Sequence, residues 1–155
     1  MTTTTGPARE VTLTRIFDAP RGVVWKAWTD PVLLAKWWGP KTFTNPVCDF
    51  DARPGGKIHI DMRAPNGTVY PMTGTVLEVI DGERLVFMSV AEDHDGNALI
   101  EGHTVVTFED LGTKTKITIH ARAAATMPIA EEMLKGMEAG WTQSLEKLDA
   151  LVSGR

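Results

Sequence analysis

Residues 128–152 read PIAEEMLKGMEAGWTQSLEKLDALV, and the spacing of their apolar side chains indicates how this chain folds. The apolar residues follow one another at intervals of three or four positions and are Ala130, Met133, Leu134, Met137, Trp141, Leu145, Leu148 and Leu151. Charged side chains occupy positions between them, which is the pattern of an amphipathic helix. The sequence therefore predicts one long C-terminal helix from Pro128 to Val152, about 37 Å in length.

The chain before this helix has the pattern of a β-sheet. Alternating apolar and polar residues, separated by turn residues, predict strands at residues 9–17, 43–51, 57–63, 70–80, 84–91, 101–109 and 115–123. Seven strands span roughly 29 Å, so the C-terminal helix is long enough to cross the sheet. The element order predicts an α+β fold in which a curved seven-stranded antiparallel sheet surrounds the helix.

Two short helices are expected after the first strand. The segments Asp18-Ala-Pro20 and Thr29-Asp30-Pro31 both have the composition of a helix start, with an aspartate as the N-cap. The first helix would bury an apolar stripe made by Val23, Val24, Ala27 and Trp28. We expect both helices to close one end of the sheet.

Length and charge exclude several classes of protein. A chain of 155 residues corresponds to about one domain, and 43% hydrophobic with 23% charged residues is typical of a globular protein. The net charge of −4 disfavours binding to nucleic acid or to anionic membranes. No apolar run approaches the roughly 20 residues that cross a bilayer. The sequence thus predicts neither a nucleic-acid nor a membrane partner.

The N-terminus and the cysteine content bear on organisation and location. Residues 1–8 include a threonine run without the basic and apolar regions of a signal peptide, and are predicted to form a flexible leader. Residues 9–153 would then form a single domain. The lone Cys48 cannot form an internal disulfide, so we expect a reducing, cytoplasmic location.

Methionine and aromatic residues are candidates for the wall of a cavity between sheet and helix. Such residues either fill a core or line a pocket, and the sequence leaves both open. The candidate ligand-binding residues are Trp37, Phe43, Ile60, Met62, Tyr70, Met72, Phe87, Met133, Met137 and Trp141. Trp25 and Trp28 are expected in the core, whereas Trp37 and Trp38 either cover the cavity or pack beneath it.

Catalytic and metal-binding residues are sparse. Glu101 and His103 share one strand face and form an acid/base pair if that face lines the cavity, or a surface pair otherwise. His59 and His120 alternate with isoleucines and are expected to face solvent, so no metal or other cofactor is predicted. Cys48 lies in an apolar strand, where burial raises the thiol pKa and makes it unreactive.

A set of short motifs occurs in an order that is similar to one known family. They are Phe17-Asp-Ala-Pro20, Val24-Trp25-Lys-Ala27, Thr29-Asp30-Pro31, Trp37-Trp38-Gly39-Pro40, Arg53-Pro54-Gly55-Gly56, Gly74-Thr-Val76, Val106-Thr-Phe108 and Gly140-Trp141 with Leu145 and Leu148. From about Glu10 to Leu151 the chain resembles the START-like (SRPBCC, Bet v 1-like) superfamily. Within it, the resemblance is to the branch named after the activator of heat-shock-protein-90 ATPase, homologue-like.

This resemblance implies a helix-grip fold in which a cavity between the sheet and the C-terminal helix holds an apolar small molecule. It also implies two other functions: a cyclase- or hydratase-like enzyme with an inward acid/base residue, or a stress-related, co-chaperone-like interaction module. The last would use an exposed apolar patch or the Trp37–Trp38 corner. A homodimer and a chaperone are further partners to consider, although we expect 155 residues to leave no room for the client-binding domain of the co-chaperone that names the branch. A hydrophobic small molecule is the expected ligand, and ligand binding is favoured over enzymatic activity.

Overall fold

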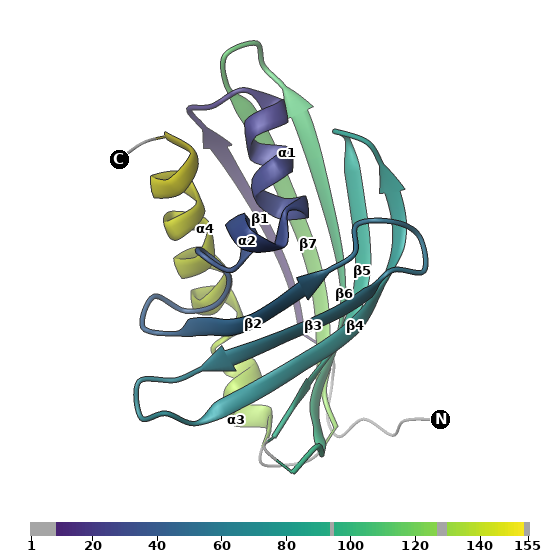
Figure 1. Ribbon diagram of the computed structural model, residues 1–155, viewed down its shortest axis with the longest axis vertical. Helices are drawn as coiled ribbons and strands as arrows, with labels where there is room; N and C mark the ends of the chain where they lie inside the picture. Colours follow the sequence, from purple (N-terminus) through teal and green to yellow (C-terminus); the bar gives the residue numbers. More distant parts are fainter. Residues whose placement is uncertain (1–8, 94, 127–129, 154–155) are drawn as a thin grey trace.

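The computed structural model describes residues 9–93, 95–126 and 130–153, which form seven strands and four helices (Figure 1). In chain order these are β1 (Arg9–Phe17), α1 (Arg21–Thr29), α2 (Pro31–Leu34), β2 (Thr44–Phe50), β3 (Lys57–Arg63), β4 (Val69–Ile80), β5 (Arg84–Glu92), β6 (Ala98–Asp110), β7 (Thr115–Ala125), α3 (Ala130–Lys135) and α4 (Met137–Ser153). The predicted flexible leader, residues 1–8, lies outside the described residues.

The strands form one antiparallel sheet in the order β1-β7-β6-β5-β4-β3-β2. The sheet is strongly curved, α4 runs along its concave side, and α1 and α2 lie at one end (Figure 1). This is the predicted α+β helix-grip arrangement. Pro46 interrupts β2, and the pairing of β2 with β3 shifts register between Thr44 and Val47, as expected for an edge strand that contains proline.

The predicted single C-terminal helix is wrong in one respect, because the structure divides it into α3 and α4 at Gly136. Glycine disfavours a helix interior by about 1 kcal/mol relative to alanine, so a break is least costly at such a residue. The predicted start at Pro128 lies outside the described residues. In α4, Leu145 and Leu148 are buried against the core, as their spacing predicted.

The start of α1 also differs from the prediction. Asp18 does not cap this helix: Pro20 is the N-cap, and no side chain accepts a hydrogen bond there. The buried apolar stripe of α1 consists of Val24, Ala27 and Trp28. Val23, which was predicted to belong to it, is 47% exposed. At α2 the prediction is confirmed, since the Asp30 carboxylate accepts a hydrogen bond from the Val32 amide.

Two glycine-containing motifs pair with each other across the sheet. The amide of Gly55 donates to the Val76 carbonyl at 2.8 Å, and the Val76 amide donates to the Gly56 carbonyl at 2.9 Å. A Cβ atom at Gly56 would lie 2.0 Å from the Asp51 carbonyl oxygen, and one at Gly74 would lie 2.1 Å from that of Met88. Both positions therefore need glycine because another backbone approaches too closely for a side chain.

Candidate functional site

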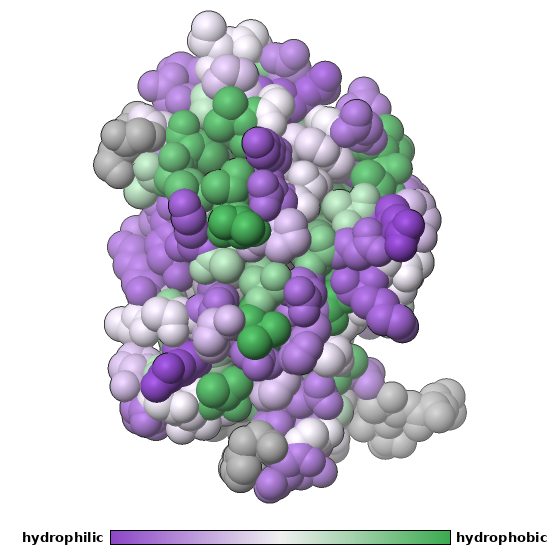
Figure 2. All heavy atoms as spheres, in the orientation of Figure 1, coloured by the Kyte–Doolittle hydropathy of each residue, from purple (hydrophilic) through white to green (hydrophobic). Residues whose placement is uncertain are grey.

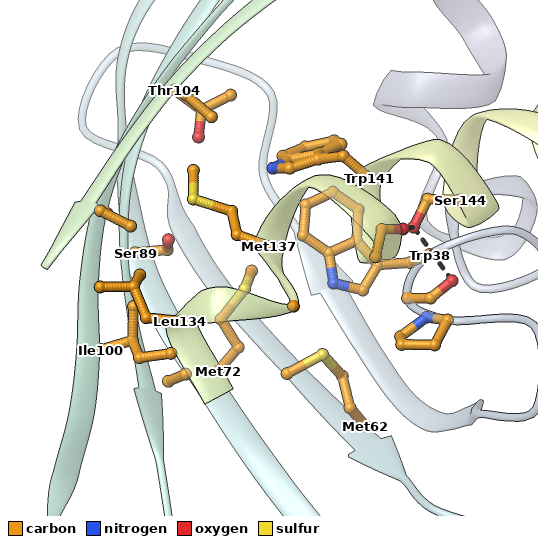
Figure 3. A pocket seen from close by; sticks show the side chains of 18 of the residues that line it. Trp38, Met62, Met72, Ser89, Ile100, Thr104, Leu134, Met137, Trp141 and Ser144 are labelled. Atoms are coloured by element: carbon orange, nitrogen blue, oxygen red, sulfur yellow. Dashed lines mark hydrogen bonds between the residues drawn. The ribbon is translucent and has the colours of Figure 1, made fainter. Parts of the chain in front are cut away.

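A cavity of about 220 Å³ lies between the concave face of the sheet and helices α3 and α4 (Figure 3). Its lining comes from the loop after α2, from β3–β7 and from both C-terminal helices. The described lining residues are Trp38, Gly39, Pro40, Met62, Met72, Phe87, Ser89, Ala91, Ile100, Gly102, Thr104, Ala121, Arg122, Ala123, Leu134, Gly136, Met137, Gly140, Trp141 and Ser144. Most of these present carbon or sulfur atoms, so the cavity is mainly apolar.

Strand alternation explains which sheet residues reach the cavity. On β6, Ile100, Gly102 and Thr104 are spaced two apart and therefore share the concave face. On β7, Ala121 and Ala123 do the same. Alanine and glycine at three of these five positions leave the space that a larger side chain would fill.

Two tryptophans form an aromatic wall on the helix side of the cavity. The rings of Trp38 and Trp141 meet edge to face with centroids 5.6 Å apart. Trp28 packs behind both rings, at 6.4 Å from Trp38 and 6.2 Å from Trp141. Because Trp28 is fully buried, it supports the wall from the core, as predicted for this residue.

The loop of residues 38–41, which supplies Trp38 to the cavity, is hydrogen-bonded to three side chains of α4. Ser144 Oγ donates to the Gly39 carbonyl at 3.0 Å, and Lys147 Nζ donates to the Pro40 carbonyl at 3.1 Å. The Lys41 amide donates to Gln143 Oε1 at 3.0 Å. Partial burial lowers the pKa of Lys147. These bonds fix the position of the loop relative to α4.

Five predicted ligand-binding residues line this cavity, namely Met62, Met72, Phe87, Met137 and Trp141. The structure places four others elsewhere. Trp37 is fully buried and donates its indole N–H to the Ala27 carbonyl, and Ile60 is fully buried in the core. Phe43 packs against Tyr70, with ring centroids 6.5 Å apart, outside the described lining. Met133 belongs to α3, but its side chain lies outside the described part of the structure.

The predicted acid/base pair does not face the cavity. Glu101 and His103 alternate along β6 with the lining residues Ile100, Gly102 and Thr104, and therefore lie on the opposite, convex face. His103 is exposed. Catalysis by Glu101 and His103 would require both side chains to face the cavity. They lie on the surface instead, which was the other alternative.

The remaining polar candidates are also outside the cavity. His59 is exposed and pairs with Asp61, with Nε2 2.9 Å from Oδ1, while exposed His120 lies 2.9 Å from Thr12 Oγ1. No cluster of three metal-ligating side chains occurs among residues 9–93, 95–126 and 130–153. Burial, followed by the nearby Asp49 carboxylate, raises the pKa of Cys48 to about 11, in the direction predicted.

Sequence reasoning missed several lining residues. For Trp38 the sequence left open whether it covers the cavity, packs beneath it or forms an interaction corner with Trp37, and the polar residues Ser89 and Thr104 were not predicted to line the cavity. The alternation of Thr104 with His103, and of Ser89 with Met88, was the available signal. This alternation identifies cavity residues only when it is known which side of each strand belongs to the concave face of the sheet.

The surface offers no counterpart to the predicted Trp37–Trp38 interaction corner. Trp37 is 0% exposed and Trp38 is 7% exposed, because both rings pack against Trp28. Figure 2 shows hydrophobic side chains gathered over the end of the molecule where α1 lies. Val23 on α1 and Val32 on α2 are among the exposed large hydrophobic residues. In the described chain, no helix has the length and apolar character needed to cross a membrane.

Comparison with known proteins gives one family and many similar structures. The model of the family described as Activator of Hsp90 ATPase homolog 1-like protein matches residues 18–153. A crystal structure of a protein from Chromobacterium violaceum is 30% identical, with a TM-score of 0.78, and the match covers 92% of this chain and 96% of that one. A solution structure from Arthrobacter aurescens is also 30% identical, with a TM-score of 0.78 and coverage of 94% and 87%.

A third similar structure carries the family name in its description. It is the AHSA1 protein from Silicibacter pomeroyi, which is 26% identical with a TM-score of 0.79, over 94% of this chain and 98% of that one. A search of the curated proteins found no match.

Proposed function

The chain belongs to the Activator of Hsp90 ATPase homolog 1-like family, and from that premise we propose that it binds a hydrophobic small molecule in the cavity between the sheet and helices α3 and α4. The observation that carries this proposal is the cavity itself, about 220 Å³ with a mainly apolar lining. Each 100 Å² of apolar ligand surface removed from water contributes roughly 2.5 kcal/mol to binding, before the entropic cost of association.

The size of the cavity suits a molecule of one or two rings. An engineered apolar cavity of about 150 Å³ in another protein holds benzene, and this cavity is larger. The methionines support the same function, because thioether side chains adapt their shape to an apolar ligand. Met62, Met72 and Met137 supply three such side chains to the lining (Figure 3).

Equilibrium dialysis against naphthalene, a neutral apolar probe, tests this proposal. The Ala123→Leu variant adds three carbon atoms on the cavity side of β7, and we expect it to weaken naphthalene binding at least tenfold. Ala124→Leu is the matched control, because Ala124 is the next residue and lies on the convex face. Absence of naphthalene binding to the wild type, or equal binding by both variants, would overturn the proposal. Thermal unfolding of both variants shows whether they are folded.

An enzymatic role has less support than carriage or sensing of a ligand. The described lining contains no carboxyl or imidazole group that could transfer a proton. A cytoplasmic location stays a prediction, based on the lone cysteine. A homodimer also stays a prediction, as does a chaperone partner, which the name of the family suggests.

A further inference from the structure

We infer that the cavity is selective for uncharged molecules that carry a hydrogen-bond acceptor such as a carbonyl group, and that it rejects carboxylates of the same shape. This inference rests on the proposed function, since it concerns the ligand of the same cavity. It follows from the hydrogen-bonding groups that line the cavity.

Two hydroxyl groups of the sheet are available to a ligand. Thr104 is 5% exposed, and its hydroxyl points into the cavity (Figure 3). Ser89 lies on the neighbouring strand, where it pairs with Gly102. A Cβ atom at Gly102 would lie 3.2 Å from Ser89 Oγ. Glycine at this position therefore leaves the Ser89 hydroxyl uncovered, and neither hydroxyl has a hydrogen-bond partner within the described chain.

The two indoles of the aromatic wall add hydrogen-bond donors. The indole nitrogen of Trp141 points toward the side of the cavity where Thr104 lies (Figure 3). Neither Trp38 nor Trp141 donates its N–H to another group of the described chain. Trp37, outside the lining, differs, because its N–H is bonded to the Ala27 carbonyl at 2.9 Å. Indole N–H groups donate only.

The third hydroxyl of the lining is already engaged. Ser144 Oγ lies 3.0 Å from the carbonyl oxygens of both Gly39 and Gly140, so its single hydrogen is directed to these two acceptors (Figure 3). The free groups are thus two donors that cannot accept and two hydroxyls that can do either. A ligand that brings a carbonyl oxygen can accept one or two hydrogen bonds from these groups, whereas a ligand that brings only donors leaves the indoles unpaired.

The lining provides nothing that balances a negative charge. Arg122 is its one ionisable residue among those described, and its side chain is exposed on the convex face. The nearby ammonium of Lys147 is directed to the carbonyl oxygens of Trp38 and Pro40 rather than into the lining. Moving an unpaired carboxylate from water into an apolar site is strongly unfavourable. A carboxylate is therefore disfavoured even though its oxygens accept hydrogen bonds.

Three naphthalene derivatives of nearly equal shape separate these effects. The probes are 2-acetylnaphthalene, which has a neutral carbonyl, 2-naphthoate, which has a carboxylate at pH 7.5, and 2-ethylnaphthalene, which has no acceptor. Equilibrium dialysis of the wild-type protein should rank the ketone first. One to two hydrogen bonds correspond to about threefold to tenfold tighter binding than for the ethyl compound, and 2-naphthoate should bind weakest.

A double variant locates the acceptor. Ser89→Ala with Thr104→Val removes both hydroxyls at nearly constant volume, and should weaken ketone binding about tenfold while leaving 2-ethylnaphthalene unchanged. Thr107→Val, on the convex face of the same strand, is the matched control and should bind all probes like the wild type. Ketone affinity equal to that of the ethyl compound, naphthoate binding as tight as the ketone, or an unaffected double variant would overturn the inference. Binding of none of the three would instead overturn the proposed function.

Discussion

Lys147 Nζ donates a hydrogen bond of 3.1 Å to the carbonyl oxygen of Pro40, and so joins α4 to the loop that supplies Trp38 to the cavity. The same ammonium lies 3.3 Å from the Trp38 carbonyl. Together with the Ser144–Gly39 bond, this contact sets where the aromatic wall stands relative to the sheet. The shape of the cavity therefore depends partly on Lys147, a side chain of α4 that is not in the described lining.

The Lys147→Met variant tests this dependence. Pro40 and Trp38 keep other hydrogen bonds, from the Phe43 amide and from Asn45 Nδ2. We therefore expect a loss of only about 1 kcal/mol in the free energy of unfolding, with a clear increase in hydrogen exchange at the Lys41 amide, which bonds to Gln143. Lys57→Met, in β3, is the control. Unchanged exchange at Lys41 would show that Lys147 does not hold the loop.

Gly140 is a glycine inside α4 that lines the cavity, with no atom within 4 Å of the place where a Cβ would stand. Gly140→Ala should raise the free energy of unfolding by up to about 1 kcal/mol, because alanine favours the helix. The same change should weaken naphthalene binding, because the methyl group occupies ligand space.

Gly22 provides the matched control for this change. It lies in α1, also has open space at its Cβ position, and is outside the described lining. Gly22→Ala should stabilise the protein without altering naphthalene binding. Chemical denaturation and dialysis measure the two effects, and equal binding by both variants would place the ligand elsewhere.

Gly74→Ala should destabilise the protein strongly. The added Cβ would lie 2.1 Å from the Met88 carbonyl oxygen, so β4 and β5 would have to separate. We expect a loss of at least about 2 kcal/mol in the free energy of unfolding. Thr73→Ala, at the exposed neighbouring position, should change it by less than about 0.5 kcal/mol. Urea denaturation distinguishes the two, and similar midpoints would contradict the close approach of the strands.

The Cys48 thiol should react slowly in the folded protein. Burial and the Asp49 carboxylate raise its pKa from 9.0 to about 11, so at pH 8 the thiolate fraction is about 100-fold below that of the unfolded chain. A thiolate of higher pKa is intrinsically more nucleophilic, which offsets part of this factor, so iodoacetamide alkylation should be roughly tenfold slower in native protein than in urea. A rate within threefold of the unfolded rate would contradict it.

The same shift predicts how stability depends on pH. Well below pH 9 the thiol is almost fully protonated in both states, whereas as the pH rises through 9 the unfolded chain loses the proton first. This group's contribution to stability therefore decreases as the pH rises from about 9 to about 11. Cys48→Ala should remove that part of the pH dependence, as measured by denaturation at several pH values.

The sheet could be predicted from the sequence because alternation and turn residues act locally. Residues 57–63, where Ile58 and Ile60 alternate with His59 and Asp61, were predicted with the bounds that β3 has. The break at Gly136 was not predicted, since the apolar spacing continues through it. Its position depends on how α3 and α4 each pack against the sheet.

The cavity lining could be predicted only in part. Large apolar residues such as Met72 and Phe87 can be recognised in the sequence as candidates for a cavity wall. Small residues such as Ala121 and Gly102 cannot, because they contribute to the cavity only by leaving space unfilled. Neighbouring tryptophans cannot be told apart by composition. Trp37 points into the core and Trp38 into the cavity because the turn after α2 directs them differently.

The most direct test of ligand binding in this cavity is a crystal structure of the protein with 2-bromonaphthalene, using anomalous scattering to locate the bromine. We predict one main peak between Met72, Met137 and Trp141. A peak over the exposed side chains of Val23 and Val32, with the cavity empty while solution binding persists, would contradict the account.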